Sequence, residues 1–261
     1  MSSDESPMGI NVGEGASIPD YRETRLVTAW LISLIGAVGL LTYMVFTYPD
    51  VTGVLLNKMP AGILTTFQVT ACSICVALPI GFIAGLGRLS KNRFINLIAS
   101  TYVEVIRGIP LLVQLFFIFY ALSWYLDISE FVAAVVGLGF CFGAYIGEIF
   151  RAGICAVNKG QAEAARSMGF NRFETMMYII LPQAFRIVLP PLGNECIAML
   201  KDTALISIVG LHDMTFITKQ QVAVDYDYFR HYAVLGLCYL IITLILSKCV
   251  SMMEAKLAYD K

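Results

Sequence analysis

The polar and apolar positions of this chain separate into long blocks, unlike the short alternations of a soluble fold. Between Met59 and Gly87 the chain carries no Asp, Glu, Lys or Arg. A helix needs about 20 mostly apolar residues to cross the hydrocarbon core of a bilayer. The pattern therefore predicts an all-α polytopic membrane protein.

Six apolar blocks predict six transmembrane helices. They cover residues 26–47, 61–87, 94–123, 131–153, 176–209 and 232–250. The first block is too long for the apolar part of a signal peptide, so we expect a retained helix. Residues 1–25 before it are mostly polar, which predicts a flexible tail.

The basic residues of the loops and tails are distributed unevenly between the two sides of the membrane. One side carries Arg22, Arg25, Arg88, Lys91, Arg93, Arg151, Lys159, Arg166, Arg172, Lys248, Lys256 and Lys261, and the other carries Lys58, Lys219 and Arg230. Cytoplasmic loops of membrane proteins are enriched in Lys and Arg. Both termini and the polar loop 157–175 are therefore predicted to be cytoplasmic.

The composition supports a membrane protein and removes other classes. Hydrophobic residues make up 58% of the chain and charged residues 14%, whereas soluble domains average about 45–50% and 25%. The formal net charge of −1 gives no indication of nucleic-acid binding. Cys72 and Cys75 form a C-x-x-C inside a predicted span, with no His nearby, and are interpreted as packing residues rather than a zinc or redox site.

The loop 157–175 is the most specific feature of the sequence. Helix-forming residues run from Gln161 to Met168, and Gly169 can end the helix in a left-handed conformation. So short a helix is marginal alone and is expected to dock on something. Ala162, Ala165 and Gly169 form one small-residue stripe, which would allow close approach to a partner; an ordinary interfacial helix is the alternative.

The same loop resembles the EAA motif, E-A-A-x3-G-x9-I-x-L-P, of ABC importer permeases. The matching residues are Glu163-Ala164-Ala165, Gly169 and Ile179-Ile180-Leu181-Pro182. In that family the loop seats a coupling helix in a groove of the ATPase subunit. The resemblance implies a coupling role for Gln161, Ala162, Glu163, Ala164, Ala165 and Gly169.

Other runs resemble the polar amino acid permeases of the histidine, glutamine and arginine type. They are Glu104-Val-Ile-Arg107-Gly108-Ile109-Pro110-Leu-Leu-Val-Gln114, Tyr145-Ile-Gly147-Glu148-Ile-Phe-Arg151, Leu181-Pro182-Gln183-Ala184 and Lys201-Asp202-Thr203. Ile109 replaces the commoner Thr. The resemblance implies a five-helix type I permease domain, residues 61–252, with helix 26–47 as an N-terminal addition.

Several partners follow from the resemblance. It implies a permease subunit in a bacterial inner membrane, a second permease chain (identical or related), two ATPase subunits, an external substrate-binding protein and a polar amino acid as substrate. The chain has no G-x-x-x-x-G-K-[ST] phosphate loop. We therefore expect no cofactor and no enzymatic activity on this chain, with ATP and Mg on the partner ATPase, and contacts to lipid but not to nucleic acid.

Ionisable residues inside the predicted spans are costly and usually pair or face a polar path. Glu104 with Arg107, and Glu148 with Arg151, have the i, i+3 spacing of structural ion pairs. Gln114 stands alone among apolar residues and is a candidate for a substrate pathway.

The fifth block carries a second group of polar residues. Pro190 and Pro191 are expected to bend or break its helix. Beyond them Asn194, Glu195, Lys201 and Asp202 form a polar stripe. A buried structural network and a pathway for a zwitterionic substrate explain this stripe equally well.

Two alternative interpretations of the sequence belong to other functional classes. A secondary transporter or channel driven by an ion gradient could use Glu104 or Asp202 as a proton site. A membrane enzyme lacks support, because no nucleophile–base pair is evident and two His are too few for a metal centre. The segment 211–232 is the longest predicted outer segment, and its mixed charges and aromatics suit either a protein interface or a solvated loop.

Overall fold

The computed structural model describes residues 23–259, so the predicted tail, residues 1–25, lies outside the described residues except for its last three. Within this range the helices are α1 (Glu23–Thr47), α2 (Pro49–Arg88), α3 (Arg93–Gly108), α4 (Leu111–Phe116), η1 (Phe117–Ala121), η2 (Leu122–Trp124), α5 (Glu130–Ala156), α6 (Lys159–Ser167), α7 (Arg172–Glu174), η3 (Thr175–Ile180), α8 (Leu181–Asp202), η4 (Thr203–Ile208), α9 (Met214–Asp225) and α10 (Tyr228–Tyr259). The described part of the chain contains helices and no strands, as predicted.

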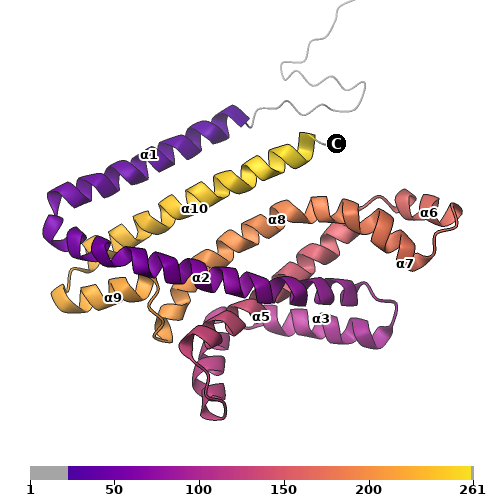
Figure 1. Ribbon diagram of the computed structural model, residues 1–261, viewed down its shortest axis with the longest axis horizontal. Coiled ribbons are helices and arrows are strands. Elements are labelled where there is room, and N and C mark those ends of the chain that lie inside the picture. The colour runs from indigo at the N-terminus through magenta and orange to yellow at the C-terminus, as the bar shows by residue number, and fades with distance from the viewer. Residues whose placement is uncertain (1–22, 260–261) are drawn as a thin grey trace, which may run out of the picture.

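Five long helical segments are apolar enough to cross a membrane, and a sixth span results if α3 and the α4–η1 segment are counted together. The six predicted spans are therefore present. Figure 1 shows α9 at one end of the molecule and α6 with α7 at the other. This separation is what a bundle needs if its two ends face opposite sides of a membrane.

The third predicted span, over 94–123, is present as two helical parts rather than as one continuous helix. Its two parts meet at an angle of 99°. Pro110 disfavours helical backbone at the preceding residue, and Ile109 is extended, with φ −105° and ψ 128°. Beyond the bend α4 packs against α5, and its Gln114 and Leu115 are buried.

The sequence predicts a bend or a break at Pro190 and Pro191, and the break is wrong, because α8 continues through both prolines as one helix. Buried contacts hold it on both sides of the prolines, through Val188 and Leu192 in the same apolar core. Gly193 approaches α10, where a Cβ atom would lie 2.8 Å from Val250. Packing therefore fixes the helix that the prolines alone would interrupt.

Glycines set the close packing of α2 against α5 at the centre of the bundle. A Cβ atom on Gly85 would lie 2.8 Å from the carbonyl oxygen of Gly147, and one on Gly81 would lie 2.5 Å from Ile146. Small residues let membrane helices approach at backbone distance. The contact fixes the position of α5, which carries one wall of the candidate site.

Helix α1 packs on the outside of the bundle, alongside α10 (Figure 1). The indole nitrogen of Trp30 donates a hydrogen bond to the carbonyl oxygen of Leu244 at 2.8 Å. Ala37 and Met44 are buried in the contact, whereas Ile32, Ile35 and Phe46 are exposed. The helix therefore covers one face of the bundle without entering its core.

Candidate functional site

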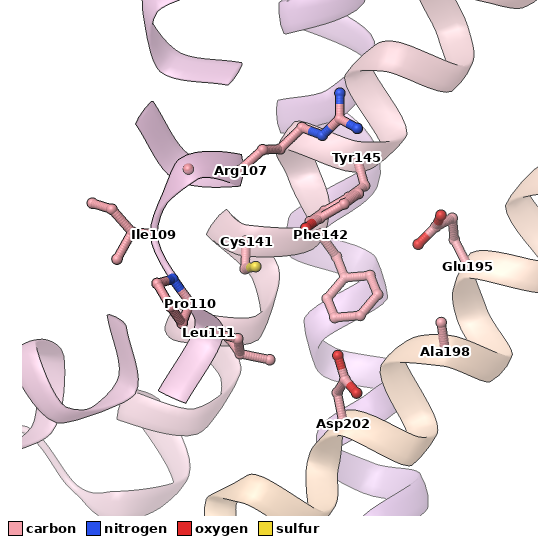
Figure 2. Close-up of a pocket in the computed structure, with 11 residues that line it drawn as sticks. Arg107, Ile109, Pro110, Leu111, Cys141, Phe142, Tyr145, Glu195, Ala198 and Asp202 are labelled. Atoms are coloured by element: carbon pink, nitrogen blue, oxygen red, sulfur yellow. The ribbon is translucent and has the colours of Figure 1, made fainter. Parts of the chain in front are cut away.

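A cavity of about 440 Å³ opens where the end of α3, the bend before α4, α5 and α8 meet (Figure 2). It is lined by Arg107, Gly108, Ile109, Pro110, Leu111, Cys141, Phe142, Tyr145, Glu195, Ala198 and Asp202. Three of these residues are ionisable groups that the sequence places inside predicted spans. The cavity therefore brings together charged groups from two different spans, Arg107 from α3 and Glu195 with Asp202 from α8.

The bend before α4 shapes one wall of the cavity, and Gln114 stabilises this bend. The Gln114 amide nitrogen donates to the carbonyl oxygens of Ile106 and Ile109, at 2.8 Å each. The side chain is buried and does not line the cavity. Gln114 therefore lies beside the cavity and not in its lining. It satisfies the backbone carbonyl oxygens that the bend leaves without helical partners.

Opposite charges face one another across the cavity. The Arg107 guanidinium lies 5.0 Å from the centre of the Tyr145 ring, a cation–π geometry. Glu195 and Asp202 reach toward the cavity from α8 (Figure 2). One guanidinium and two carboxylates can bind the carboxylate and the ammonium group of one zwitterion.

The predicted polar stripe on α8 divides into two parts. Glu195 and Asp202 are half-buried and line the cavity. Asn194 and Lys201 are exposed on this chain and lie outside the cavity lining. The structure therefore brings together two of the four residues, with Arg107 as a third member that was predicted for a different role.

The two predicted ion pairs have different outcomes. Glu148 binds Arg151, with 2.5 Å between carboxylate oxygen and guanidinium nitrogen, and it also binds Arg88 at the end of α2. No ion pair joins Glu104 to Arg107 among the described residues, so that prediction is wrong. Tyr145, on α5, draws the Arg107 side chain away from its own helix face.

The predicted helix in loop 157–175 is confirmed as α6, and Gly169 ends it with φ +91°. The Asn158 side chain accepts a hydrogen bond from the Gly160 backbone nitrogen at 2.8 Å and caps the start of the helix. The Phe170 backbone nitrogen donates to the Ala165 carbonyl oxygen at 3.1 Å, which closes the end.

The small-residue stripe of α6 does not face outward as expected. Ala165 is 3% exposed, and Ala162 packs on the apolar cluster of Ile154, Val157, Ile180 and Ala184. Met168 and Phe173 are exposed apolar side chains at this end of the chain, 77% and 71% exposed, and Tyr178 on η3 is exposed as well. The stripe therefore docks α6 on its own chain, and Met168 with Phe173 forms the free surface, which the sequence reasoning missed.

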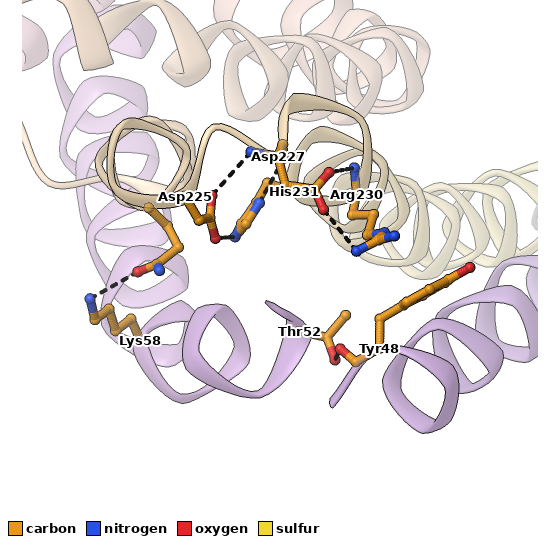
Figure 3. Close-up of polar contacts among 8 residues, drawn as sticks. Tyr48, Thr52, Lys58, Asp225, Asp227, Arg230 and His231 are labelled. Carbon is orange, nitrogen blue, oxygen red and sulfur yellow. Dashed lines mark hydrogen bonds and ion pairs between the residues drawn. The ribbon is translucent and has the colours of Figure 1, made fainter. Parts of the chain in front are cut away.

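The segment 211–232, predicted to be external, is mostly helical, and three of its charged residues, Asp225, Asp227 and Arg230, form ion pairs within it (Figure 3). Asp225 lies 3.3 Å from the buried ring of His231, and Asp227 lies 3.1 Å from Arg230. Arg230 in turn lies 4.0 Å from the centre of the Tyr48 ring. These contacts tie α9 and α10 to the turn between α1 and α2. A protein interface and a solvated surface both stay predictions for this segment.

The cysteines of the described part of the chain differ in burial. Cys72 and Cys75 are free thiols exposed on α2, whereas Cys141 is buried beside the cavity. No group of three or more His, Cys, Asp or Glu residues that could hold a metal ion occurs in the described part of the chain.

Comparison with known proteins gives a family for this arrangement. The family described as the binding-protein-dependent transport system inner membrane component matches residues 77–258. The glutamine transport system permease protein GlnP of Escherichia coli (strain K12) is 37% identical over 195 residues, covering 74% of this chain and 89% of that protein. The histidine/lysine/arginine/ornithine transport system permease protein HisQ of the same strain is 38% identical over 194 residues, 70% of this chain and 85% of that protein.

Solved structures agree with this assignment. A crystal structure of an amino acid ABC transporter with histidines has a TM-score of 0.74 and 40% identity, covering 77% of this chain and 94% of that chain. An inward-facing methionine ABC transporter shares the fold, with a TM-score of 0.65 at 20% identity over 78% of this chain and 96% of that chain.

Proposed function

We propose that this chain, which belongs to the family of binding-protein-dependent transport system inner membrane components, moves polar amino acids through the cavity between α3, α5 and α8. It is a multi-pass inner-membrane transporter subunit rather than an enzyme. The observation that carries the proposal is the placement of Arg107 opposite Glu195 and Asp202.

The charges of the cavity match the two ends of an amino acid. Arg107 supplies planar donors for the α-carboxylate, while Glu195 and Asp202 accept from the α-ammonium group. The cavity volume of about 440 Å³ lies in the range of small-molecule sites. Asn194 and Lys201, exposed on the neighbouring face of α8, are proposed to complete the pathway with a second permease chain. Gln114 supports this site by holding the bend.

Coupling to ATP hydrolysis is assigned to the α6–α7 corner. Ala162 and Ala165 fix α6 on the bundle, which leaves Gln161, Glu163 and Ala164 exposed together with Met168 and Phe173. An exposed apolar surface rimmed by polar residues is typical of a protein interface. We assign the ATPase subunit to this surface, with ATP and Mg bound on that subunit and no cofactor on this chain.

The proposed complex has two permease chains, identical or related, two ATPase subunits and an external binding protein. The excess of Lys and Arg at the α6 end supports a cytoplasmic position for this end and for both termini. Residues 61–252 are proposed to form the type I permease domain, and the helix over 26–47 to be an addition that meets lipid through its exposed Ile32, Ile35 and Phe46.

Uptake by proteoliposomes that contain the assembled complex tests this function. Labelled amino acid should accumulate only with ATP at the α6 face and binding protein at the opposite face. Inactivating the nucleotide site of the ATPase should stop uptake while the membrane potential is intact. Uptake that persists and instead collapses with an ionophore would refute the proposal in favour of a transporter driven by an ion gradient.

Substitutions in the cavity test the site separately. Glu195→Gln and Asp202→Asn keep the side-chain volume and remove one charge each, so we expect several-fold slower uptake with normal assembly. Asp127→Asn, in the described turn after η2, is the matched control for charge removal. Equal uptake by all three variants would show that the amino acid does not pass through the cavity.

A further inference from the structure

Helix α3 has a continuous polar face that the proposed function does not yet use. Arg93, Asn96, Ser100, Glu104 and Arg107 follow one another at intervals of three or four residues, which places them along one side of a helix. The opposite side carries Ile95, Ile98 and Tyr102, which line an apolar groove of about 370 Å³ with α2 and α5. The helix is therefore strongly amphipathic across its whole length.

The polar face is open on this chain. Arg93, Glu104 and Arg107 are exposed, and Asn96 and Ser100 are half-exposed. The first part of the face lines a surface hollow of about 510 Å³ that includes Arg93, Asn96 and Ser100. Among the described residues none forms an ion pair with Glu104. The Glu104 carboxylate must therefore contact water or a second chain.

Depth in the membrane makes lipid an unsuitable neighbour for this face. Glu104 lies 11 residues after Arg93, which is about 17 Å along the helix. A carboxylate at that depth is normally found facing a bundle interior or a water-filled cavity. The apolar side of α3 is the side suited to lipid, so the polar side faces the interior of the assembled transporter.

The polar face also joins two functional regions. It ends at Arg107, which lines the cavity, and it begins at the basic loop Leu89–Asn92, at the same end of the molecule as α6 (Figure 1). A row of hydrophilic side chains thus runs from the cavity to the proposed cytoplasmic surface.

We infer that the α3 face formed by Arg93, Asn96, Ser100 and Glu104 lines the hydrated route by which a polar amino acid leaves the cavity for the cytoplasm. The inference rests on the proposed function and assigns a route to it. Glu104 faces water on this route, close to the substrate's ammonium group, and Arg93 at the exit offers a guanidinium to its carboxylate.

Thiol labelling of the assembled complex distinguishes water from lipid on the two sides of α3. A variant free of the seven native cysteines receives Ser100→Cys on the polar face or Ile98→Cys on the apolar face. Both positions are accessible on the isolated chain, so only the surroundings in the membrane differ. An impermeant methanethiosulfonate reagent, which reacts with the thiolate in water, is added to inside-out vesicles.

We expect Ser100→Cys to react at least tenfold faster than Ile98→Cys, and its modification to block uptake. Glu104→Cys should react as Ser100→Cys does. Equal rates at Ser100 and Ile98, or no reaction at either polar-face position, would overturn the inference. ATP-driven uptake by the unlabelled variants is measured in parallel in proteoliposomes that enclose ATP on the α6 side, so a failure of the proposed function appears separately from a failure of the route.

A second pair of variants avoids thiol chemistry. Ser100→Leu makes the route apolar and should slow uptake at least fivefold without changing the amount of assembled complex. Ser100→Thr keeps the hydroxyl with a smaller increase in volume and should retain uptake close to that of the wild-type chain. Normal uptake by Ser100→Leu would contradict the inference.

Discussion

Replacing Gly169 by Ala isolates the backbone strain at the end of α6. The residue has φ +91°, a conformation that costs an L-residue about 1–2 kcal/mol. A Cβ atom at this position meets nothing within 4 Å, so the whole penalty comes from the backbone. Because about 1.4 kcal/mol corresponds to a factor of ten in an equilibrium constant, the equilibrium constant for forming the closed end of α6 should fall by about 5–30-fold.

The assay is ATP hydrolysis stimulated by the binding protein in the reconstituted complex. We expect Gly169→Ala to weaken stimulation, Gly169→Val to weaken it further, and Gly169→Asn to come nearest to wild type because Asn tolerates positive φ best. Gly53→Ala is the matched control, since Gly53 lies in α2 and also has no neighbour within 4 Å of a Cβ atom. Normal stimulation by Gly169→Ala would refute the reasoning that the α6 end transmits the coupling.

Three further changes probe the scaffold around the site. The new methyl group of Gly85→Ala would lie 2.8 Å from a carbonyl oxygen of α5. This variant should destabilise the detergent-solubilised chain by about 1–3 kcal/mol in thermal melting. Gly39→Ala, which has free space around its new methyl group, should leave the stability unchanged. Glu148→Ala leaves two partly buried arginines unpaired and should cost about 1–3 kcal/mol, with Glu148→Gln intermediate in the same melts. Burial raises the pKa of the Asp213 carboxyl from 3.8 to about 6, so the folded protein holds this proton more tightly than the unfolded chain and loses stability as the pH rises through that range. Asp213→Asn, which retains a side-chain acceptor for the Phe216 backbone nitrogen, should therefore gain in melting temperature over wild type as the pH rises from about 4 to about 6 and keep a constant advantage above that. The same difference at all pH values would contradict this.

The spans and the α6 end could be predicted because their signals are local. A block of apolar residues long enough to cross a bilayer has few alternatives, and Gly169 supplies the left-handed conformation on its own. The six spans and the α6 helix follow from such signals without knowledge of the rest of the fold.

Features that depend on contacts between distant helices could not be predicted. The packing of Val188 and Leu192 overrides the helix-breaking tendency of the Pro190-Pro191 pair. Tyr145 lies 38 positions after Arg107 in the sequence, yet it draws Arg107 away from Glu104. The inward direction of Ala162 and Ala165 likewise depends on a cluster built from α5, η3 and α8.

The bend at Ile109 could have been predicted from the sequence. Pro110 disfavours a helical residue before it, but the apolar residues continue on both sides, so the block 94–123 was counted as one span. Gln114, an isolated polar residue four positions after this proline, satisfies carbonyl groups that the bend exposes. A buried amide close to a proline in an apolar run was the signal for a broken helix.

The central claim, that an amino acid passes between Arg107 and the two carboxylates of α8, is tested most directly by the substrate charge dependence of uptake. The measurement compares initial rates for glutamine, arginine and glutamate in proteoliposomes with the wild-type chain and with the double variant Glu195→Gln, Asp202→Asn, all with saturating binding protein and ATP. If these carboxylates face the substrate, the double variant should lose arginine uptake most strongly and glutamate uptake least. A uniform reduction for all three amino acids, or none, would contradict the claim.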